Sequence, residues 1–149
     1  MEGSRKSYFS GLIMKIHELP TPCFVIDETK LIHNLEILSE VEKRTGAKIL
    51  LAQKCFSCFE EYPLIGKYIS GTTASGLYEA RLGKEEMGLE NHVYSPAYRS
   101  SDIEEDVKEL VKICDHMIFN SISQLEKYKN LCKETSVGIR INPECSTQG

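Results

Sequence analysis

The chain repeats one local pattern, in which a short run of β-branched or apolar residues is followed by a stretch with helical periodicity. The runs start about every 20 to 26 residues, which is the spacing of βα units. A chain of this kind is expected to form a parallel sheet with crossover helices. Six strands are predicted: Cys23–Asp27, Ala47–Ala52, Gly71–Ala74, His92–Ser95, His116–Asn120 and Val137–Ile141.

Helix signals fill the segments between these strands. Asp27 can cap a helix whose apolar residues recur every three or four positions up to Val41. Gly46 suits the left-handed end of that helix. Further helices are predicted over Glu60–Ile69, with Pro63 in the first turn, over Gly76–Met87, and after two capping-box patterns, Ser101–Glu104 and Ser123–Glu126.

Two architectures share this alternation: an open doubly wound sheet and a (βα)8 barrel. A nucleotide-binding doubly wound fold usually has a glycine-rich turn after its first strand. The turn here, Asp27–Lys30, has no glycine, and this favours the barrel. A whole barrel takes about 250 residues, so we expect about six βα units of an α/β barrel in this chain of 149 residues. Residues 1–19 are then an N-terminal extension and residues 20–149 a partial barrel.

Composition narrows the classes of function. The net charge is −4, and Lys and Arg are spread among Asp and Glu, which argues against a nucleic-acid partner. No window approaches the roughly 20 uninterrupted apolar residues of a membrane span, and no signal-peptide core follows the polar N-terminus. We therefore expect a cytoplasmic chain with no membrane partner.

Six cysteines occur, most of them among apolar neighbours, which predicts free thiols rather than disulfides. Cys55 and Cys58 form a C-x-x-C pair, the spacing of a redox centre or of half a zinc site. No second pair completes a zinc site and the four histidines are scattered along the sequence, so no metal site is predicted. A small redox or ligand-binding module that uses Cys55 and Cys58 remains an alternative.

The functional groups of either architecture should lie at the carboxyl ends of the strands. Lys54 follows a predicted strand, where partial desolvation would free its amine for Schiff-base chemistry unless the side chain simply reaches solvent. The Gly71–Gly76 turn consists of small residues and leads into a helix that contains Glu79. Such a turn allows a ligand to approach the helix N-terminus, but its serine and threonine residues are equally suited to capping the helix. Arg140 lies in an apolar strand and needs an anionic partner, either a cofactor or a carboxylate such as Glu79.

Five ordered motifs with matching separations cover most of the chain from Pro20 onward. They are Ala52–Phe56, Gly71–Gly83, His92–Tyr98, Cys114–Gln124 and Ile139–Glu144. Together they resemble the carboxynorspermidine (carboxyspermidine) decarboxylase family. The resemblance implies a pyridoxal-phosphate enzyme of the alanine racemase-like fold type, related to diaminopimelate and ornithine decarboxylases. Such enzymes join a barrel to a C-terminal β-domain and form homodimers.

By this resemblance Lys54 is the lysine that forms a Schiff base with pyridoxal 5′-phosphate, Arg140 lies near the cofactor ring, and Glu79 is an acidic residue of the active face. The implied reaction releases the carboxylate of carboxynorspermidine or carboxyspermidine as CO2 in polyamine biosynthesis. By the same resemblance, the phosphate-binding loop and the β-domain would come after Gly149. We therefore expect residues 1–149 alone to be inactive. Two alternatives remain: a non-catalytic pyridoxal-phosphate-binding barrel, and an amino-acid decarboxylase of the diaminopimelate or ornithine type.

Overall fold

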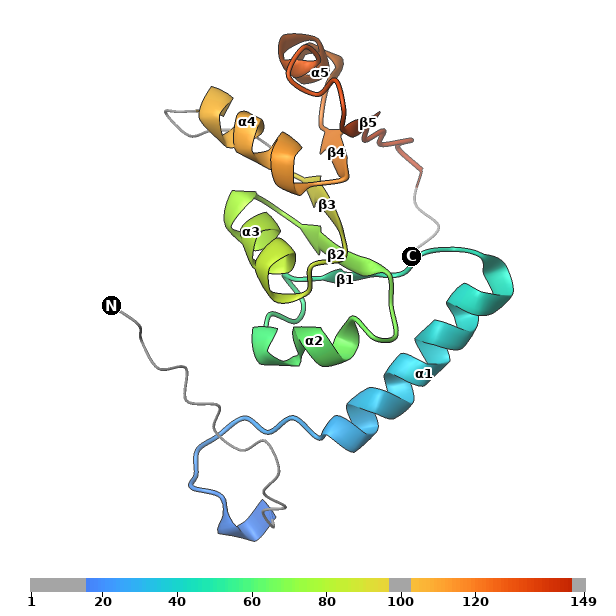
Figure 1. Cartoon of the computed structure of the whole chain (residues 1–149), viewed down its shortest axis with the longest axis vertical. Helices are drawn as coiled ribbons and strands as arrows, with labels where there is room; N and C mark the ends of the chain where they lie inside the picture. Colours follow the sequence, from blue (N-terminus) through green and yellow to red (C-terminus); the bar gives the residue numbers. More distant parts are fainter. Residues whose placement is uncertain (1–15, 97–102, 146–149) are drawn as a thin grey trace.

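The structure, a computed structural model, describes residues 16–96 and 103–145. Five parallel strands form one sheet in the order β1-β2-β3-β4-β5, which is also their order along the chain (Figure 1). A doubly wound sheet reverses its strand order at a switch point, whereas in a barrel each strand pairs with the next. The predicted partial (βα) barrel is therefore confirmed. Its strands are β1 Leu50–Ala52, β2 Gly71–Ala74, β3 Glu90–Tyr94, β4 His116–Phe119 and β5 Ser136–Ile139.

Helices connect these strands in the predicted places. Five of the six predicted strands are confirmed, with ends shifted by at most three residues. The predicted helix over Glu60–Ile69 is present, but its regular α-helical part is short and begins after a 3-10 turn. The helices are η1 Ile16–Glu18, α1 Glu28–Thr45, η2 Phe59–Glu61, α2 Tyr62–Ile65, α3 Leu77–Glu86, α4 Ile103–Ile113 and α5 Ile122–Tyr128.

The first predicted strand, Cys23–Asp27, is wrong, because this segment is irregular and pairs with no strand among the described residues. Phe24 is fully exposed, and Val25 and Ile26 are 56% and 38% exposed. A strand needs a neighbour that satisfies its backbone N–H and C=O groups. Helix α1, about 27 Å long at 1.5 Å per residue, carries the segment away from β1 (Figure 1). Cys23–Asp27 therefore has the apolar residues typical of a strand, but no described strand lies beside it to pair with its backbone.

Helix α1 begins and ends where its caps predict. The Asp27 side chain accepts a hydrogen bond from Lys30 N at 3.2 Å, and Gly46 takes a left-handed φ of 71° while its N–H bonds to Glu42 O. Leu35 is the one α1 side chain that is fully buried, at 4% exposed. It joins the apolar cluster formed by α2 and β1. Near the end of α1, Glu42 Oε1 also accepts from Ser70 Oγ at 2.8 Å, so the helix is attached at two places.

The capping box predicted at Ser123–Glu126 is also wrong, since α5 begins two residues earlier. Ser121 is the N-cap, and its hydroxyl accepts a hydrogen bond from Gln124 N at 3.2 Å. Gln124 Oε1 in turn accepts from the N–H of Asn120, the residue before the N-cap, at 3.1 Å. For α4, Ser101 and Asp102 lie outside the described residues.

Helices α3 and α4 pack on one face of the sheet. Burial alternates along β3: Asn91 and Val93 are fully buried, whereas Glu90, His92 and Tyr94 are half-buried and point to the other face. Asn91 Nδ2 donates to a carbonyl of each helix, which identifies the helix-covered side. Two apolar clusters fill this side: Ala74, Ala80, Val93, Val107, Leu110, Cys114, Met117, Phe119, Tyr128 and Cys132 in one, and Leu35, Tyr62, Ile65 and Ile69 in the other.

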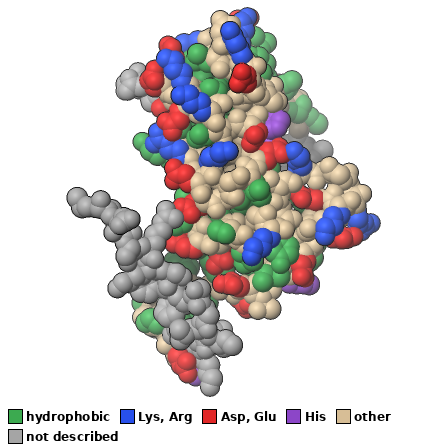
Figure 2. Space-filling view, viewed as in Figure 1, with side chains coloured by type: hydrophobic (Ala, Val, Ile, Leu, Met, Phe, Trp, Pro, Cys, Tyr) green, Lys and Arg blue, Asp and Glu red, His purple; other side chains and the backbone are tan. Residues whose placement is uncertain are grey.

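The surface carries both signs of charge intermixed, as the composition predicts (Figure 2). Neither Lys and Arg nor Asp and Glu gather into a patch of one sign on the face shown. Among the described residues, no helix has the length and apolar character needed to cross a bilayer.

Candidate functional site

The carboxyl ends of the five strands carry the side chains singled out from the sequence. Lys54 follows β1, Glu79 lies in the helix after β2, and Arg140 follows β5 directly. Two further polar side chains that the sequence analysis did not assign, Tyr94 and Asn120, end β3 and follow β4. Because the strands are parallel, these ends lie along one edge of the sheet, with Lys54 at the first strand and Arg140 at the last. We call this edge the carboxyl edge.

Lys54 projects from a tight turn at the end of β1. Cys55 N and Phe56 N both donate to Ala52 O, at 2.9 and 3.3 Å, and so form this turn. Lys54 is exposed, and its amine has no hydrogen-bond or ion-pair partner within the described residues. The partial burial expected from the sequence is therefore absent, and the alternative of a lysine that reaches solvent describes the geometry. An amine without a partner is nonetheless open to a carbonyl reagent.

A buried polar residue holds the backbone just before Lys54. Gln53 is 1% exposed, and its backbone N–H donates to Thr73 O at 3.2 Å, which ties the end of β1 to β2. The Gln53 side-chain oxygen accepts from the Tyr62 hydroxyl at 3.4 Å, while its Nε2 has no partner among the described residues. Burial, followed by the nearby charge of Glu79, raises the pKa of Tyr62, so this phenol stays protonated and able to donate.

The Glu79 carboxylate binds the backbone just before helix α3. The N-cap residue Gly76 has no side chain to cap the helix, and Glu79 Oε2 accepts from Ser75 N at 2.6 Å. A carboxylate already lies at this helix N-terminus, so the anion site considered for the Gly71–Gly76 turn is not supported. The alternative that a serine or threonine caps this helix is not supported either, because α3 has no side-chain cap at Gly76 and the Ser75 N–H binds Glu79 instead.

Arg140 is exposed rather than buried in a strand, because β5 ends one residue before it. Its Nη1 donates to the Tyr94 hydroxyl at 2.8 Å, and its guanidinium carbon lies 4.9 Å from the centroid of the Tyr94 ring. The Tyr94 hydroxyl donates in turn to Asn120 Oδ1 at 3.0 Å. Within the described residues Arg140 has no carboxylate partner, so the suggested Glu79–Arg140 pair is not formed. A tyrosine positions this arginine.

The C-x-x-C pair does not have the features of a redox centre. Cys55 is exposed and Cys58 half-buried, and both thiols are free. Burial and the neighbouring Glu60 carboxylate raise the pKa of Cys58, whereas redox-active cysteines of this motif have a lowered pKa. The structure therefore gives no support to a redox module.

Two histidines that are far apart in the sequence come together in the sheet. His92 and His116 are paired in register on β3 and β4, and Glu90 lies beside them. The sequence analysis looked for metal ligands at short spacings and predicted none. His92 and His116 are separated in the sequence by about the length of one βα unit. This spacing could have indicated that the two histidines lie side by side on neighbouring strands.

Comparison with known proteins agrees with the predicted resemblance. No family model matches the chain. A carboxynorspermidine/carboxyspermidine decarboxylase of Herminiimonas arsenicoxydans is 41% identical over 128 residues, which is 86% of the chain and 34% of the relative. The enzyme of that name from Campylobacter jejuni is 38% identical over 133 residues, again 34% of its length. A carboxyaminopropylagmatine decarboxylase of Synechocystis is 39% identical over 134 residues.

A solved structure shows the same likeness in three dimensions. The crystal structure of the Campylobacter jejuni carboxynorspermidine decarboxylase, complexed with norspermidine, matches with a TM-score of 0.81 and 38% identity. The match covers 87% of the chain and 34% of that structure. The chain thus spans about a third of the length of the curated relatives it matches. Over that third, it is homologous to the carboxynorspermidine/carboxyspermidine decarboxylases.

Proposed function

We propose that this chain is the lysine-bearing part of a pyridoxal-phosphate-dependent decarboxylase that acts on a carboxylated polyamine. The observation that carries the proposal is the exposed amine of Lys54, which lies without a partner at the carboxyl edge of a sheet homologous to these decarboxylases. The names of the relatives support the substrate class. Two act on carboxynorspermidine or carboxyspermidine and one on carboxyaminopropylagmatine.

The residues at the carboxyl edge fit an anionic carbonyl cofactor. Lys54 offers a free amine, and Arg140 uses one of its five N–H donors within the described residues. The remaining donors are available to an anionic oxygen of the cofactor or substrate. When bound, pyridoxal phosphate supplies an electron sink for the pair of electrons left behind by CO2. Lys54 Nζ would bind the cofactor and hold a proton, and Arg140 would orient an anionic group.

The roles of the three predicted site residues differ in this proposal. Lys54 is the catalytic residue, because its amine would hold the cofactor. Arg140 binds, and Tyr94 positions it through the hydroxyl and the ring face. Glu79 acts on the site indirectly, since its carboxylate is engaged by Ser75 N at the start of α3.

Covalent labelling tests the Lys54 assignment. Protein incubated with a substoichiometric amount of pyridoxal phosphate is reduced with borohydride, and the labelled lysine is identified by peptide mapping. We expect most of the label on Lys54, and its loss in Lys54→Arg. Lys67→Arg is the matched control, because Lys67 is an exposed lysine in the turn after α2. Equal labelling of Lys54 and Lys67 would refute the assignment.

The activity is tested on the full-length protein that the gene encodes. We expect CO2 release from carboxynorspermidine, carboxyspermidine or carboxyaminopropylagmatine, and none in Lys54→Arg. Label on Lys54 without CO2 release from any of them would identify a non-catalytic pyridoxal-phosphate-binding barrel. Release from diaminopimelate or ornithine alone would identify an amino-acid decarboxylase. We also propose that the full-length protein is a homodimer, which sedimentation measures directly.

A further inference from the structure

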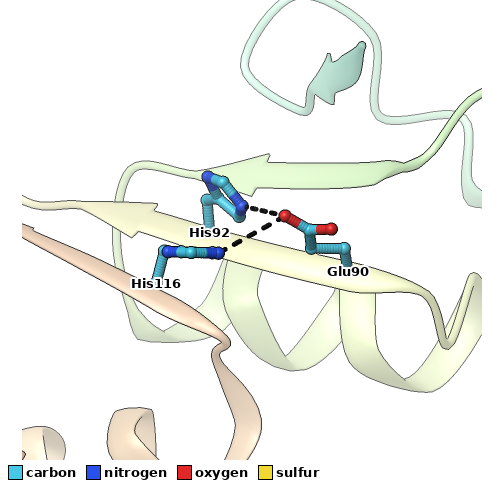
Figure 3. A group of neighbouring side chains, drawn as sticks. All are labelled: Glu90, His92 and His116. Atoms are coloured by element: carbon cyan, nitrogen blue, oxygen red, sulfur yellow. Dashed lines mark hydrogen bonds and ion pairs between the residues drawn. The ribbon is translucent and has the colours of Figure 1, made fainter. Parts of the chain in front are cut away.

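Three possible metal ligands meet on the face of the sheet away from α3 and α4 (Figure 3). Glu90 and His92 are two residues apart on β3, so both side chains point to the same face. His116 begins β4 and is the register partner of His92. The two imidazole rings lie with centroids 4.2 Å apart at an interplanar angle of 50°. Regular strand geometry thus places a carboxylate and two imidazoles around one point.

The distances are close to those of a metal coordination shell. His92 Nε2 lies 2.7 Å and His116 Nε2 lies 3.4 Å from Glu90 Oε1, and one ligand atom of each residue falls within 4.8 Å of the others. In a tetrahedral zinc site with bonds of about 2.1 Å, neighbouring ligand atoms are about 3.4 Å apart. The His116 contact already has this separation, and the His92 contact needs to open by less than 1 Å.

The remaining carboxylate oxygen is held by a lysine. Lys48 Nζ forms an ion pair with Glu90 Oε2, on the side of the carboxylate away from the imidazoles. Metal sites commonly have such an outer partner, which fixes the orientation of a ligand. Within the described residues, the Glu90 side chain is 16% exposed and the His116 side chain is 37% exposed.

We propose that Glu90, His92 and His116 bind a divalent transition-metal ion of the zinc class, with the fourth position open to water. The ligand set of two imidazoles and one carboxylate suits such ions rather than Mg²⁺ or Ca²⁺, which prefer oxygen ligands alone. The site includes the first residues of β3 and β4 and is separate from Lys54 and the carboxyl edge. It does not rest on the proposed decarboxylase activity.

Cobalt spectroscopy tests the proposal on the full-length protein that the gene encodes. Thiols are first alkylated, because exposed cysteines bind the same metals. Titration with Co²⁺ is expected to give the strong visible bands of a four-coordinate site with no sulfur ligand. Loss of an outer partner alone weakens metal sites by about 10- to 100-fold, so His92→Ala and His116→Ala should each weaken binding by at least about 100-fold. His33→Ala, which removes an exposed histidine of α1, should leave binding unchanged.

A second measurement needs no variant. Diethyl pyrocarbonate modifies accessible imidazoles, and mapping shows which histidines react with and without Zn²⁺. The proposal requires Zn²⁺ to protect His92 and His116 but not His33. Absence of the visible Co²⁺ bands, binding unchanged in both histidine variants, or equal protection of all three histidines would each overturn it. The cluster would then be an ion network of Lys48, Glu90 and the two histidines.

Discussion

Gly83 lies on the face of α3 that meets β2, and its missing side chain sets how closely the helix approaches the sheet. A Cβ atom at this position would lie 2.3 Å from Thr72 Oγ1 and 2.9 Å from Gln53 Nε2. Both of those side chains are 1% exposed, and Thr72 Oγ1 donates to Asn91 Oδ1 at 3.0 Å. Gly83→Ala is therefore expected to move α3 outward or to break the bond between Thr72 and Asn91.

The size of the effect follows from three contributions. An extra carbon forced into a packed interior costs about 1–3 kcal/mol, and loss of a buried hydrogen bond costs about 1–3 kcal/mol. Alanine is more favourable than glycine inside a helix by about 1 kcal/mol, which opposes the first two. The free energy of unfolding should therefore fall by about 1–5 kcal/mol in Gly83→Ala.

Urea unfolding followed by circular dichroism measures this change. Glu85→Ala, at an exposed position of the same helix, is the matched control and should stay within about 0.5 kcal/mol of the wild type. In a Thr72→Ala background, where Oγ1 is gone, Gly83→Ala should cost less than it does alone. A Gly83→Ala protein as stable as the wild type would refute the close approach of helix and sheet.

Three further predictions concern single side chains. Tyr94→Phe removes the hydroxyl that accepts from Arg140 and should weaken pyridoxal-phosphate labelling of Lys54 by about fivefold, equivalent to about 1 kcal/mol. Burial raises the pKa of the Cys114 thiol from 9.0 to about 12. The stability that the neutral thiol contributes is complete below pH 9 and is lost as the pH rises toward 12, so wild type should lose stability relative to Cys114→Ala over that range. Asp27→Ala removes the N-cap of α1 and should cost about 1 kcal/mol in urea unfolding, whereas Asp27→Ser should cost little.

Elements specified by neighbouring residues were predictable from the sequence. The caps Asp27 and Gly46 gave both ends of α1, and the Gly71–Ala74 strand has the predicted bounds. Prediction failed where the structure of a segment depends on its contacts with other parts of the chain. Cys23–Asp27 has a strand-like pattern but no neighbouring strand, and the α5 cap was misplaced because Ser121 and Ser123 offer similar hydroxyls two residues apart.

In the candidate site too, some features were predictable from the sequence and others depend on contacts between distant residues. Parallel topology was enough to place Lys54 and Arg140 at one edge of the sheet. The sequence did not show that β5 ends before Arg140, nor that the Tyr94 hydroxyl receives its hydrogen bond, because both depend on pairing between strands. His92 and His116 escaped notice for the same reason, since their proximity arises from the register of β3 and β4.

The sequential strand order has a consequence for how the chain folds. Residues paired across each ladder are only 19 to 24 positions apart in the chain. The entropic cost of closing a loop rises with its length, and each strand pairing here closes only a short loop. Because each strand pairs with the one before it, no pairing depends on a strand that comes later in the chain. During synthesis, each strand can therefore dock on its predecessor soon after it emerges, and the sheet can grow in the direction of translation.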